Sequence, residues 1–275
     1  MRLTSWNILH GQGAPSLKAL ADELAVGNSD FVIGVQEVDA FQDRSDQVFQ
    51  LSQIASALGA NHFGFLRCVI GTPGIKWRKL RSDENVLITN SSVELQAMGG
   101  ESPPSYGIGL ITNIPVIKWE VLPLGKSPIG LPLAFPAGDQ SQVNSGKFNP
   151  KIKFFYVKDE PRYAIAAQLN NGYTVVNVHL SFVPIINLIQ LFRVKRWLRK
   201  MPGQHILLGD LNLPFDIPVK LSKWRSLVAM KSYPTWDPKI QFDYILSDNL
   251  KLENIQPIFI ESRVSDHLPV TIEIN

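Results

Sequence analysis

The sequence has little cysteine, no long hydrophobic run and no strong excess of charge of either sign. Its single cysteine, Cys68, excludes an intramolecular disulfide framework and is typical of a reducing compartment. The longest apolar stretch, residues 183–192, is interrupted by Pro184, Asn187 and Gln190 and is too short to span a bilayer. Residues 2–7 alternate as in a strand and do not resemble a secretion signal. We therefore expect a cytoplasmic monomer without stable membrane insertion.

The balance of charge and composition is that of an ordinary globular protein. The 27 basic and 24 acidic residues leave a net charge of +3, too small to indicate a nucleic-acid binder by charge alone. With 45% hydrophobic and 19% charged residues, disordered, collagenous and coiled-coil classes are excluded. No linker or internal repeat divides the chain, so we expect one domain over residues 1–275.

Hydrophobic periodicity predicts a chain rich in strands. Amphipathic spacing favours helices over residues 17–26, with Ser16 as the cap, 46–58 and 185–200. The Asn170-Asn171-Gly172 sequence predicts a hairpin turn. The predicted strands are residues 2–9, 30–38, 107–112, 162–169, 173–180, 205–209, 243–246, 254–260 and 269–274.

One region differs in composition from the rest. Residues 99–150 contain 8 Gly and 8 Pro, over twice the density of the whole chain. We expect residues of about 121–150 to form a long surface loop inserted into the domain. Long loops in compact domains are often functional, and a mobile insertion without function is an equally good interpretation.

Polar residues that are poor choices for a core occur at the ends of several predicted strands. Each taken alone has an ordinary interpretation as a turn, a cap or a satisfied histidine. Together they offer hard oxygen ligands, which suit Mg²⁺ better than zinc, and two histidines with carboxylates to orient them. That set suits metal-assisted hydrolysis of a phosphate ester. The residues are Asn7, Glu37, His179, Asp210, Asn212, Asp243, Asp266 and His267.

The order of these motifs along the chain resembles the endonuclease/exonuclease/phosphatase superfamily. Its members include DNase I-like nucleases, abasic-site endonucleases, inositol polyphosphate 5-phosphatases and neutral sphingomyelinases. The resemblance runs from Ser5-Trp6-Asn7 to Ser265-Asp266-His267, and its most specific part is Gly209-Asp210-Leu211-Asn212 with that last motif. It implies a mixed α/β fold, a four-layered α/β/β/α sandwich of two mainly antiparallel sheets with the active site at one edge.

The resemblance also implies a metal centre. By analogy, Glu37 is the principal Mg²⁺ ligand with Asn7 beside it, and Asp266 binds metal directly or through water. Mn²⁺ is expected to substitute for Mg²⁺.

The remaining motif residues take catalytic roles by the same analogy. His267 is the essential histidine, and Asp243 orients it, fixing its tautomer and raising its basicity. Either Asp210 or His267 is the general base, and the analogy leaves this open. Asn212 positions the phosphate or the water. His179 donates a hydrogen bond to a phosphate oxygen.

The sequence departs from the family pattern beside His179. DNase I-like members supply a carboxylate to the equivalent histidine from the strand near residues 107–110. Here that neighbourhood reads Ser105-Tyr106-Gly107, so Tyr106 and Glu101 are the alternative partners.

The substrate is less clearly marked than the chemistry. Lys76, Arg78 and their neighbours interleave four cations with an aromatic side chain, which suits a nucleic-acid strand or an ordinary solvated loop. Arg162 either faces a phosphate or pairs with Glu160 or Asp159.

These observations favour a Mg²⁺-dependent phosphodiester hydrolase, with a nuclease acting on DNA or RNA as the leading hypothesis. A phosphomonoesterase, or a hydrolase of lipid or inositol-phosphate head groups, is the alternative on the same site. A non-catalytic binding module is the third hypothesis, and the intact set of motif residues argues against it.

Overall fold

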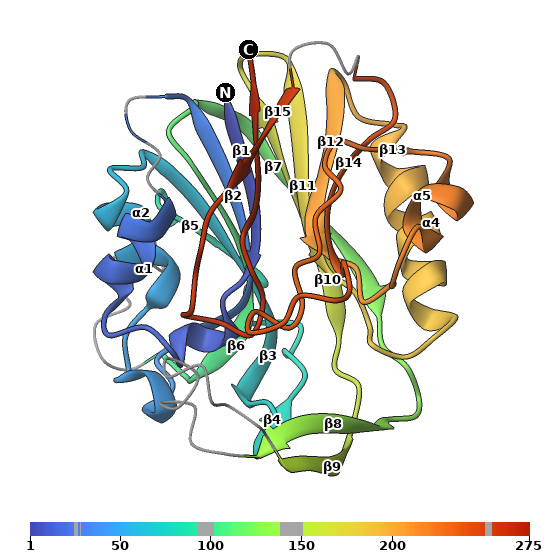
Figure 1. Ribbon diagram of the computed structural model, residues 1–275. Helices are drawn as coiled ribbons and strands as arrows, with labels where there is room; N and C mark the ends of the chain where they lie inside the picture. Colours follow the sequence, from blue (N-terminus) through green and yellow to red (C-terminus); the bar gives the residue numbers. More distant parts are fainter. Residues whose placement is uncertain (25–26, 28, 93–101, 138–150, 251–254) are drawn as a thin grey trace.

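Two large β-sheets pack face to face, and helices cover their outer faces (Figure 1). The computed structural model describes residues 1–24, 27, 29–92, 102–137, 151–250 and 255–275. The arrangement is the four-layered α/β/β/α sandwich that the motif resemblance implies. Most strand pairs are antiparallel; β1 with β2 and β11 with β12 are the parallel pairs among the described strands.

The first sheet has the order β15-β16-β1-β2-β6-β3-β4, with β5 also paired to β3. It therefore brings together the N-terminal and C-terminal parts of the chain, because β1 lies between β2 and β16. Its strands are β1 (Arg2–Asn7), β2 (Phe31–Ala40), β3 (His62–Thr72), β4 (Lys76–Arg78), β5 (Leu87–Thr89), β6 (Ser105–Thr112), β15 (Ile255–Phe259) and β16 (Val270–Ile274).

The second sheet has the order β13-β14-β12-β11-β10-β7. The predicted hairpin between β10 and β11 is confirmed, with Gly172 at a φ of 89° in its turn. Its strands are β7 (Val116–Gly125), β10 (Arg162–Leu169), β11 (Tyr173–His179), β12 (Gln204–Asp210), β13 (Arg225–Ser226) and β14 (Asp243–Ser247).

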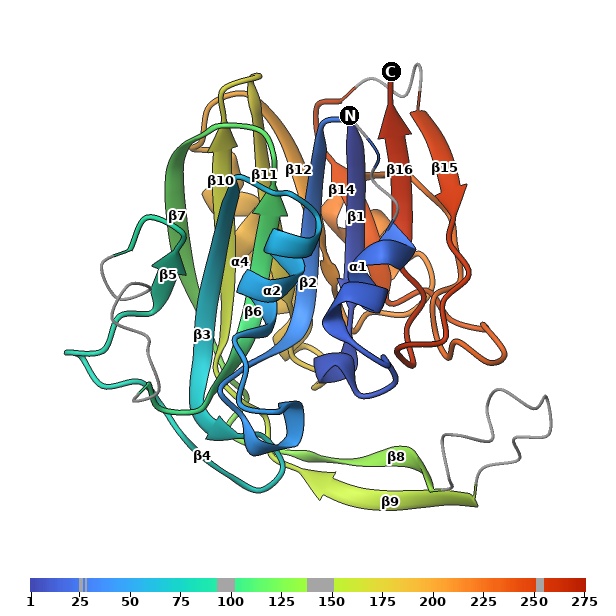
Figure 2. The ribbon, with the colours of Figure 1, turned by 90° about the vertical axis from the view of Figure 1, so that its left-hand side faces the viewer.

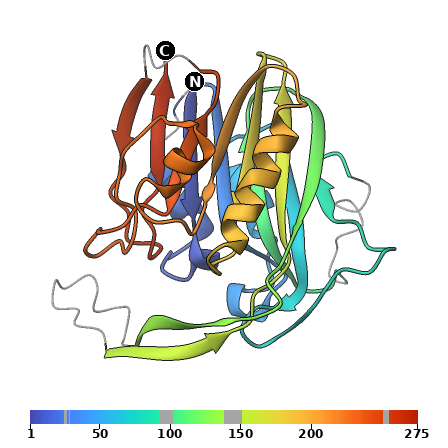
Figure 3. The same ribbon diagram turned by 90° about the vertical axis from the view of Figure 1, so that its right-hand side faces the viewer.

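Helices α1 (Leu17–Leu24) and α2 (Gln50–Ala57) cover the first sheet, while α4 (Ile186–Leu198) and α5 (Ile217–Ser222) cover the second (Figures 1 and 3). Two 3₁₀ turns, Leu9–Gly11 and Asp43–Ser45, precede α1 and α2. The cap expected at Ser16 is present, since its Oγ accepts the Ala19 N–H at 3.1 Å. The second helix begins later than predicted because Asp46 and Gln47 have positive φ angles of 57° and 52°, which turn the chain before it can become helical.

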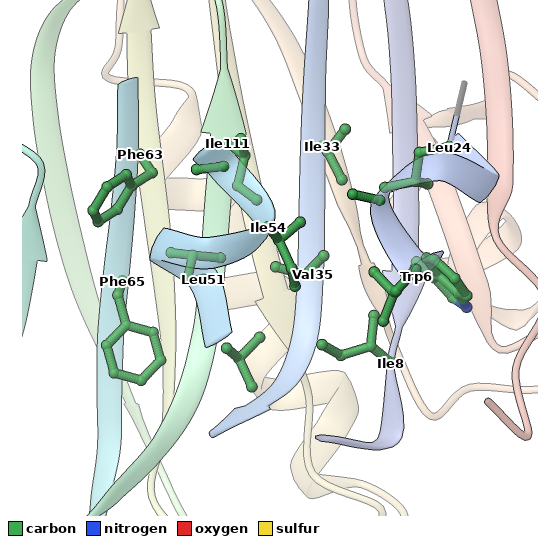
Figure 4. Packing of buried hydrophobic residues seen from close by; sticks show 14 of the residues in the cluster. Trp6, Ile8, Leu24, Ile33, Val35, Leu51, Ile54, Phe63, Phe65 and Ile111 are labelled. Carbon is green, nitrogen blue, oxygen red and sulfur yellow. The ribbon is translucent and has the colours of Figure 1, made fainter. Parts of the chain in front are cut away.

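Three hydrophobic clusters hold the layers together. Figure 4 shows the first, in which Trp6, Leu51 and Phe65 pack between the first sheet and its helices. A second cluster lies between the two sheets, and a third lies beneath α4.

A buried polar contact joins the two sheets within the second cluster. Asn177 of β11 donates from Nδ2 to the carbonyl oxygens of Val35 at 3.0 Å and Gly109 at 2.8 Å, both in the first sheet. Its Oδ1 accepts from Gln36 Nε2 at 2.6 Å. Gly34 leaves the room for this contact, because a Cβ there would lie 2.9 Å from the Asn177 side chain.

The loop expected over residues 121–150 was wrong for the part that the structure describes. Residues 121–125 continue β7, and β8 (Leu131–Ala137) pairs with β9 (Lys151–Val157) in a separate two-stranded sheet. Residues 138–150 lie outside the described part. Pro123 is tolerated because β7 is an edge strand, and Pro132 because a two-stranded ribbon has only edges. We call residues 131–137 with 151–157 the β8–β9 arm.

Candidate active site

A cleft of about 560 Å³ opens where the strands of both sheets end. Strand register explains why the motif residues meet there, since His179 on β11 pairs with Asp210 on β12, which pairs with Asp243 on β14. The first sheet delivers its polar residues to the same cleft. The predicted residues that line it are Asn7, Glu37, Tyr106, Arg162, His179, Asp210, Asn212, Asp266 and His267.

Glu37 lies at an irregularity of β2. The register with β6 shifts between Val35 and Val38, and Glu37 has a φ of 57°. A bulge of this kind turns one side chain out of the regular alternation. A left-handed conformation is costly for a glutamate, so this position is held by the surrounding sheet.

Asn7 connects the carboxylates of the two sheets. Its Nδ2 donates to Glu37 Oε1 at 3.0 Å and to Asp210 Oδ2 at 3.2 Å. Burial and the neighbouring Asp266 raise the pKa of Glu37 to about 7, although the Asn7 hydrogen bond opposes the shift. Carboxylates gathered in this way are poorly compensated without a cation.

The second group is a row of Asp243, His267 and Asp210. His267 Nδ1 lies 2.7 Å from Asp243 Oδ2, and its Nε2 lies 3.9 Å from Asp210 Oδ2. Burial alone would lower the pKa of His267, but the carboxylates of Asp243, Asp210 and Asp266 together raise it well above its usual value. The pKa of Asp210 is raised to about 6, by burial and by Asp243. The directions of the two shifts favour a protonated His267 beside an ionised Asp210 above a pH of about 6.

Buried hydrogen bonds hold this row in place. Ser232 Oγ donates to Asp243 Oδ2 at 2.6 Å, and Trp6 Nε1 donates to the His267 carbonyl oxygen at 2.9 Å. Ser265 Oγ accepts the His267 N–H at 3.2 Å and lies 2.6 Å from the Asn7 carbonyl oxygen. The Ser-Asp-His motif thus ties the His267 backbone to β1.

His179 has the opposite electrostatic character. Burial lowers its pKa well below the usual value, and the positive charges of Arg162 and His267 lower it further, so the ring is neutral. Its Nε2 lies 3.7 Å from Asp210 Oδ2. Its buried Nδ1 has no hydrogen-bond partner among the described residues, Tyr106 included. Glu101, the other partner considered, lies outside them.

Asn212 is fixed on the far side of Asp210. Its φ is 48°, its Nδ2 donates to the Leu180 carbonyl oxygen at 3.0 Å, and its backbone N–H donates to Asp210 Oδ1 at 2.9 Å. The second hydrogen of Nδ2 is left for a ligand in the cleft, which Asn212 lines.

The residues present fit a divalent cation. Asp210, Asp243 and His267 bring possible ligand atoms within 4.8 Å of one another. Asp243 and His267 already bond each other, so the oxygen atoms of Glu37 and Asn7, with Asp266 nearby, are the better donors. A cation beside Glu37 would favour its charged form against the burial that raises its pKa. An all-oxygen set of this kind suits a hard ion.

The predicted substrate residues divide into two groups. Arg162 is 4% exposed and lines the cleft, and it forms the ion pairs of the second alternative, at 3.6 Å from Asp159 and 3.3 Å from Glu160. Lys76 and Arg78 flank Trp77 on β4; of these three only Trp77 lines the cleft. Arg78 is engaged by Glu84 in two contacts of 2.6 Å.

Sequence reasoning missed several residues of the cleft wall. Arg44 is the clearest, because Asp39 holds its Nε and Nη2 at 2.7 and 2.8 Å. Its place depends on the 3₁₀ turn after β2, for which the sequence has no strong signal. The other residues that line the cleft without having been predicted as site residues include His10, Trp77, Lys158, Glu160, Phe182 and Tyr233.

A family model described as the Endonuclease/Exonuclease/phosphatase family matches residues 4–267. The chain belongs to this family. Members of the endonuclease/exonuclease/phosphatase family are phosphoric ester hydrolases that depend on divalent metal ions, so this chain is an enzyme of that class. Among curated proteins, none matches the sequence.

Solved structures of this family share the fold at low sequence identity. A family protein from Leptotrichia buccalis C-1013-b has a TM-score of 0.58 and 14% identity, covering 100% of this chain and 99% of that one. The mannosyl-6-phosphatase Bt3783 of Bacteroides thetaiotaomicron has a TM-score of 0.53 and 13% identity, with 99% of this chain and 98% of that one covered. D. rerio TDP2 complexed with single-strand DNA product has a TM-score of 0.53 and 13% identity, with 99% of this chain and 97% of that one covered. Likeness at this level establishes the fold and leaves the substrate open.

Proposed function

We propose that this member of the endonuclease/exonuclease/phosphatase family hydrolyses a phosphodiester by metal-assisted attack of water on phosphorus. The observation that carries the proposal is the row Asp243, His267 and Asp210 facing the Asn7–Glu37 pair across one cleft. Carboxylates that can hold a cation, a base for the attacking water and hydrogen-bond donors for a phosphate all lie at this cleft.

Glu37 and Asn7 would hold Mg²⁺, with Asp266 reaching it directly or through water, and Mn²⁺ would substitute. The ion, when bound, neutralises phosphate charge and lowers the pKa of a bound water. Asn7 Oδ1 accepts the Leu9 N–H at 3.1 Å and keeps a second lone pair for this role.

Asp210 is the proposed general base. In the resting site His267 carries protons on both nitrogens, because Asp243 faces Nδ1 and Asp210 faces Nε2. The carboxylate of Asp210 is therefore the group free to take a proton from water. His267 then supplies positive charge, and neutral His179 and Asn212 supply hydrogen bonds, as charge grows on the phosphate oxygens.

Nucleic acid is the first substrate we propose. Trp77 offers a flat surface along the cleft, the buried Tyr106 lines it and Arg162 offers a cation, and one structural neighbour was solved in complex with a single-strand DNA product. A phosphomonoester is the second candidate, because another neighbour is a mannosyl-6-phosphatase. We place the enzyme in the cytoplasm as a monomer; no described helix is both long and apolar enough to cross a membrane.

Hydrolysis of an aryl phosphodiester and the matching monoester, with Mg²⁺, Mn²⁺ or chelator, tests the proposal. Asp210→Asn is the control. We expect diester cleavage that disappears with chelator and in the variant. Preference for the monoester would overturn the diester assignment, and metal binding without turnover of any phosphate ester would return the binding-module hypothesis.

A further inference from the structure

The β8–β9 arm carries three exposed aromatic side chains in a row. Phe154, Phe155 and Tyr156 are 72%, 54% and 64% exposed. Large apolar side chains gathered on a surface mark an interaction site, whereas single ones do not. The arm is not hydrogen-bonded to either large sheet, and it runs along the end of the molecule where β1 and β12 deliver the catalytic residues (Figures 2 and 3).

The aromatic side chains lie on both faces of this thin ribbon. Successive residues of a strand alternate, so Phe155 faces opposite to Phe154 and Tyr156. Phe155 pairs with Leu133, which lines the cleft, and residues directly opposite share a face. A partner laid against one face would leave the other in water. A medium that surrounds the ribbon would cover both faces.

Exposed aliphatic residues extend this surface. Ile75, in the turn between β3 and β4, is 83% exposed, and Ile129, just before β8, is 58% exposed. The two segments lie side by side (Figures 1 and 2), and the Lys126 ammonium lies 5.8 Å from the centre of the Trp77 ring. Isoleucine has no flat ring on which a base could stack, so these residues favour lipid over nucleic acid.

The segments that follow β11 and β12 also carry exposed apolar side chains. Ile185 and Phe215 are each 68% exposed. Ile185 comes six residues after His179, and Phe215 three residues after Asn212, so both follow directly from catalytic strand ends. Within the part of the chain that the structure describes, seven of the twelve large exposed hydrophobic residues belong to the arm, the residues just before it, the β3–β4 turn and the segments after β11 and β12. They are Ile75, Ile129, Phe154, Phe155, Tyr156, Ile185 and Phe215.

The charge of these segments is positive. Residues 126–158 contain five lysines and one aspartate. Lys76, Lys79 and Lys158 are exposed and make no ion pair among the described residues. Lysines next to exposed aromatic and aliphatic side chains are complementary to an anionic lipid surface, which adds charge attraction to apolar burial.

We propose that the β8–β9 arm and the β3–β4 turn form a docking surface for an anionic lipid bilayer, which places the mouth of the cleft against the membrane. The aromatic side chains of the arm enter the interface, and the lysines face the head groups. This surface goes beyond the hydrolytic function, and binding is expected even when the catalytic centre is disabled.

Flotation of the Asp210→Asn protein with phosphatidylcholine vesicles, with and without phosphatidylserine, tests the proposal. We expect binding to the anionic vesicles that weakens as salt is added. Phe154→Ser with Phe155→Ser should reduce the apparent affinity at least about tenfold, because both rings lose apolar burial. The matched control is Ile117→Ser with Phe259→Ser, since each is 70% exposed and lies on an edge strand, β7 or β15.

Other outcomes would overturn the proposal. These are folded protein that binds no vesicle, equal loss in the control, a dimer in sedimentation velocity that the arm substitutions dissociate, or arm substitutions that weaken oligonucleotide binding instead. Introducing the arm substitutions into the otherwise unchanged enzyme should leave hydrolysis of the small aryl diester intact. That readout separates failure of the docking surface from failure of the hydrolytic site.

Discussion

At the scale of single residues, the cleft separates two histidines by their surroundings. His267 is flanked by carboxylates that keep it charged, whereas His179 is buried beside Arg162 and stays neutral. In the proposed mechanism, one imidazole therefore supplies charge and the other a neutral hydrogen bond. The difference comes from neighbours that are remote in sequence, so neither motif alone could predict it.

Substituting either Asp210 or His267 should stop turnover. We expect Asp210→Asn or His267→Ala to reduce kcat/KM at least about 10³-fold, because the base or the charge beside the phosphate is lost. Hydrolysis of the aryl diester measures the effect, and circular dichroism checks the fold. A variant that keeps a tenth of the activity would contradict these roles.

Glu37 should control the response to metal. We expect Glu37→Gln to raise the Mg²⁺ concentration needed for half activation by at least about tenfold. Substituting a residue that only hydrogen-bonds to a metal ligand already lowers metal affinity or activity by about 10–100-fold. Activity measured across a Mg²⁺ titration, with recovery at high metal, separates this from a folding defect. An unchanged titration would mean that Glu37 is not a ligand.

Metal activation should also depend on pH. The pKa of Glu37 is raised to about 7, so below this pH a proton occupies the carboxylate and competes with the ion. We expect the half-activating Mg²⁺ concentration to rise about tenfold per pH unit below 7 and to level off above 8. Titrations at several pH values measure it, and Glu37→Gln should flatten the dependence. A half-activating Mg²⁺ concentration that increases with pH would contradict this prediction.

At the scale of elements, strand β4 places its aromatic side chain and its basic side chains on different faces, although they are neighbours in the sequence. Trp77 turns to the cleft, whereas Lys76 and Arg78 stay on its outer surface and Arg78 is tied to Glu84. A cationic run was visible in the sequence. Its strand geometry, which sends alternate side chains to opposite faces, was not.

Neutralising Lys76 of β4 and Lys79, which follows the strand, tests the nucleic-acid hypothesis. Lys76→Gln with Lys79→Gln leaves the Arg78–Glu84 pair intact and should lower polynucleotide affinity several-fold while sparing the aryl diester. Arg199→Gln with Lys200→Gln, at the end of α4, is the control. Equal losses on both substrates would show a structural role, and no loss on polynucleotide would contradict the hypothesis.

Most elements were predictable because their hydrophobic periods are regular. Strands β10, β11, β12, β14 and β16 lie where the sequence predicts them. Strand β3 was not predicted, although it has eleven residues, and neither was β9, which contains no proline. Strands β7 and β8 were hidden by prolines that only edge strands tolerate. The motif residues were predictable as a set, whereas Arg44 and Ser232 depend on turns that the sequence does not mark.

At the scale of the whole molecule, the buried amide of Asn177 adds a polar bridge between the two sheets. Asn177→Ala should lower the free energy of unfolding by about 2–4 kcal/mol, because it leaves buried groups of the first sheet without their partners. Urea denaturation measures the loss. Gln36→Ala should cost less in an Asn177→Ala background than alone, and strict additivity would contradict the coupling.

The pairing of β1 with β16 has a consequence for biosynthesis. Trp6 and Asn7 are synthesised about 260 residues before Ser265 and His267, the partners that complete their surroundings. A nascent chain can therefore pair β1 with β2 early, but β1 lacks β16 until those later residues have emerged. Under the proposed roles a growing chain cannot hydrolyse a phosphate ester before His267 has been added, so activity also reports that β1 and β16 have come together.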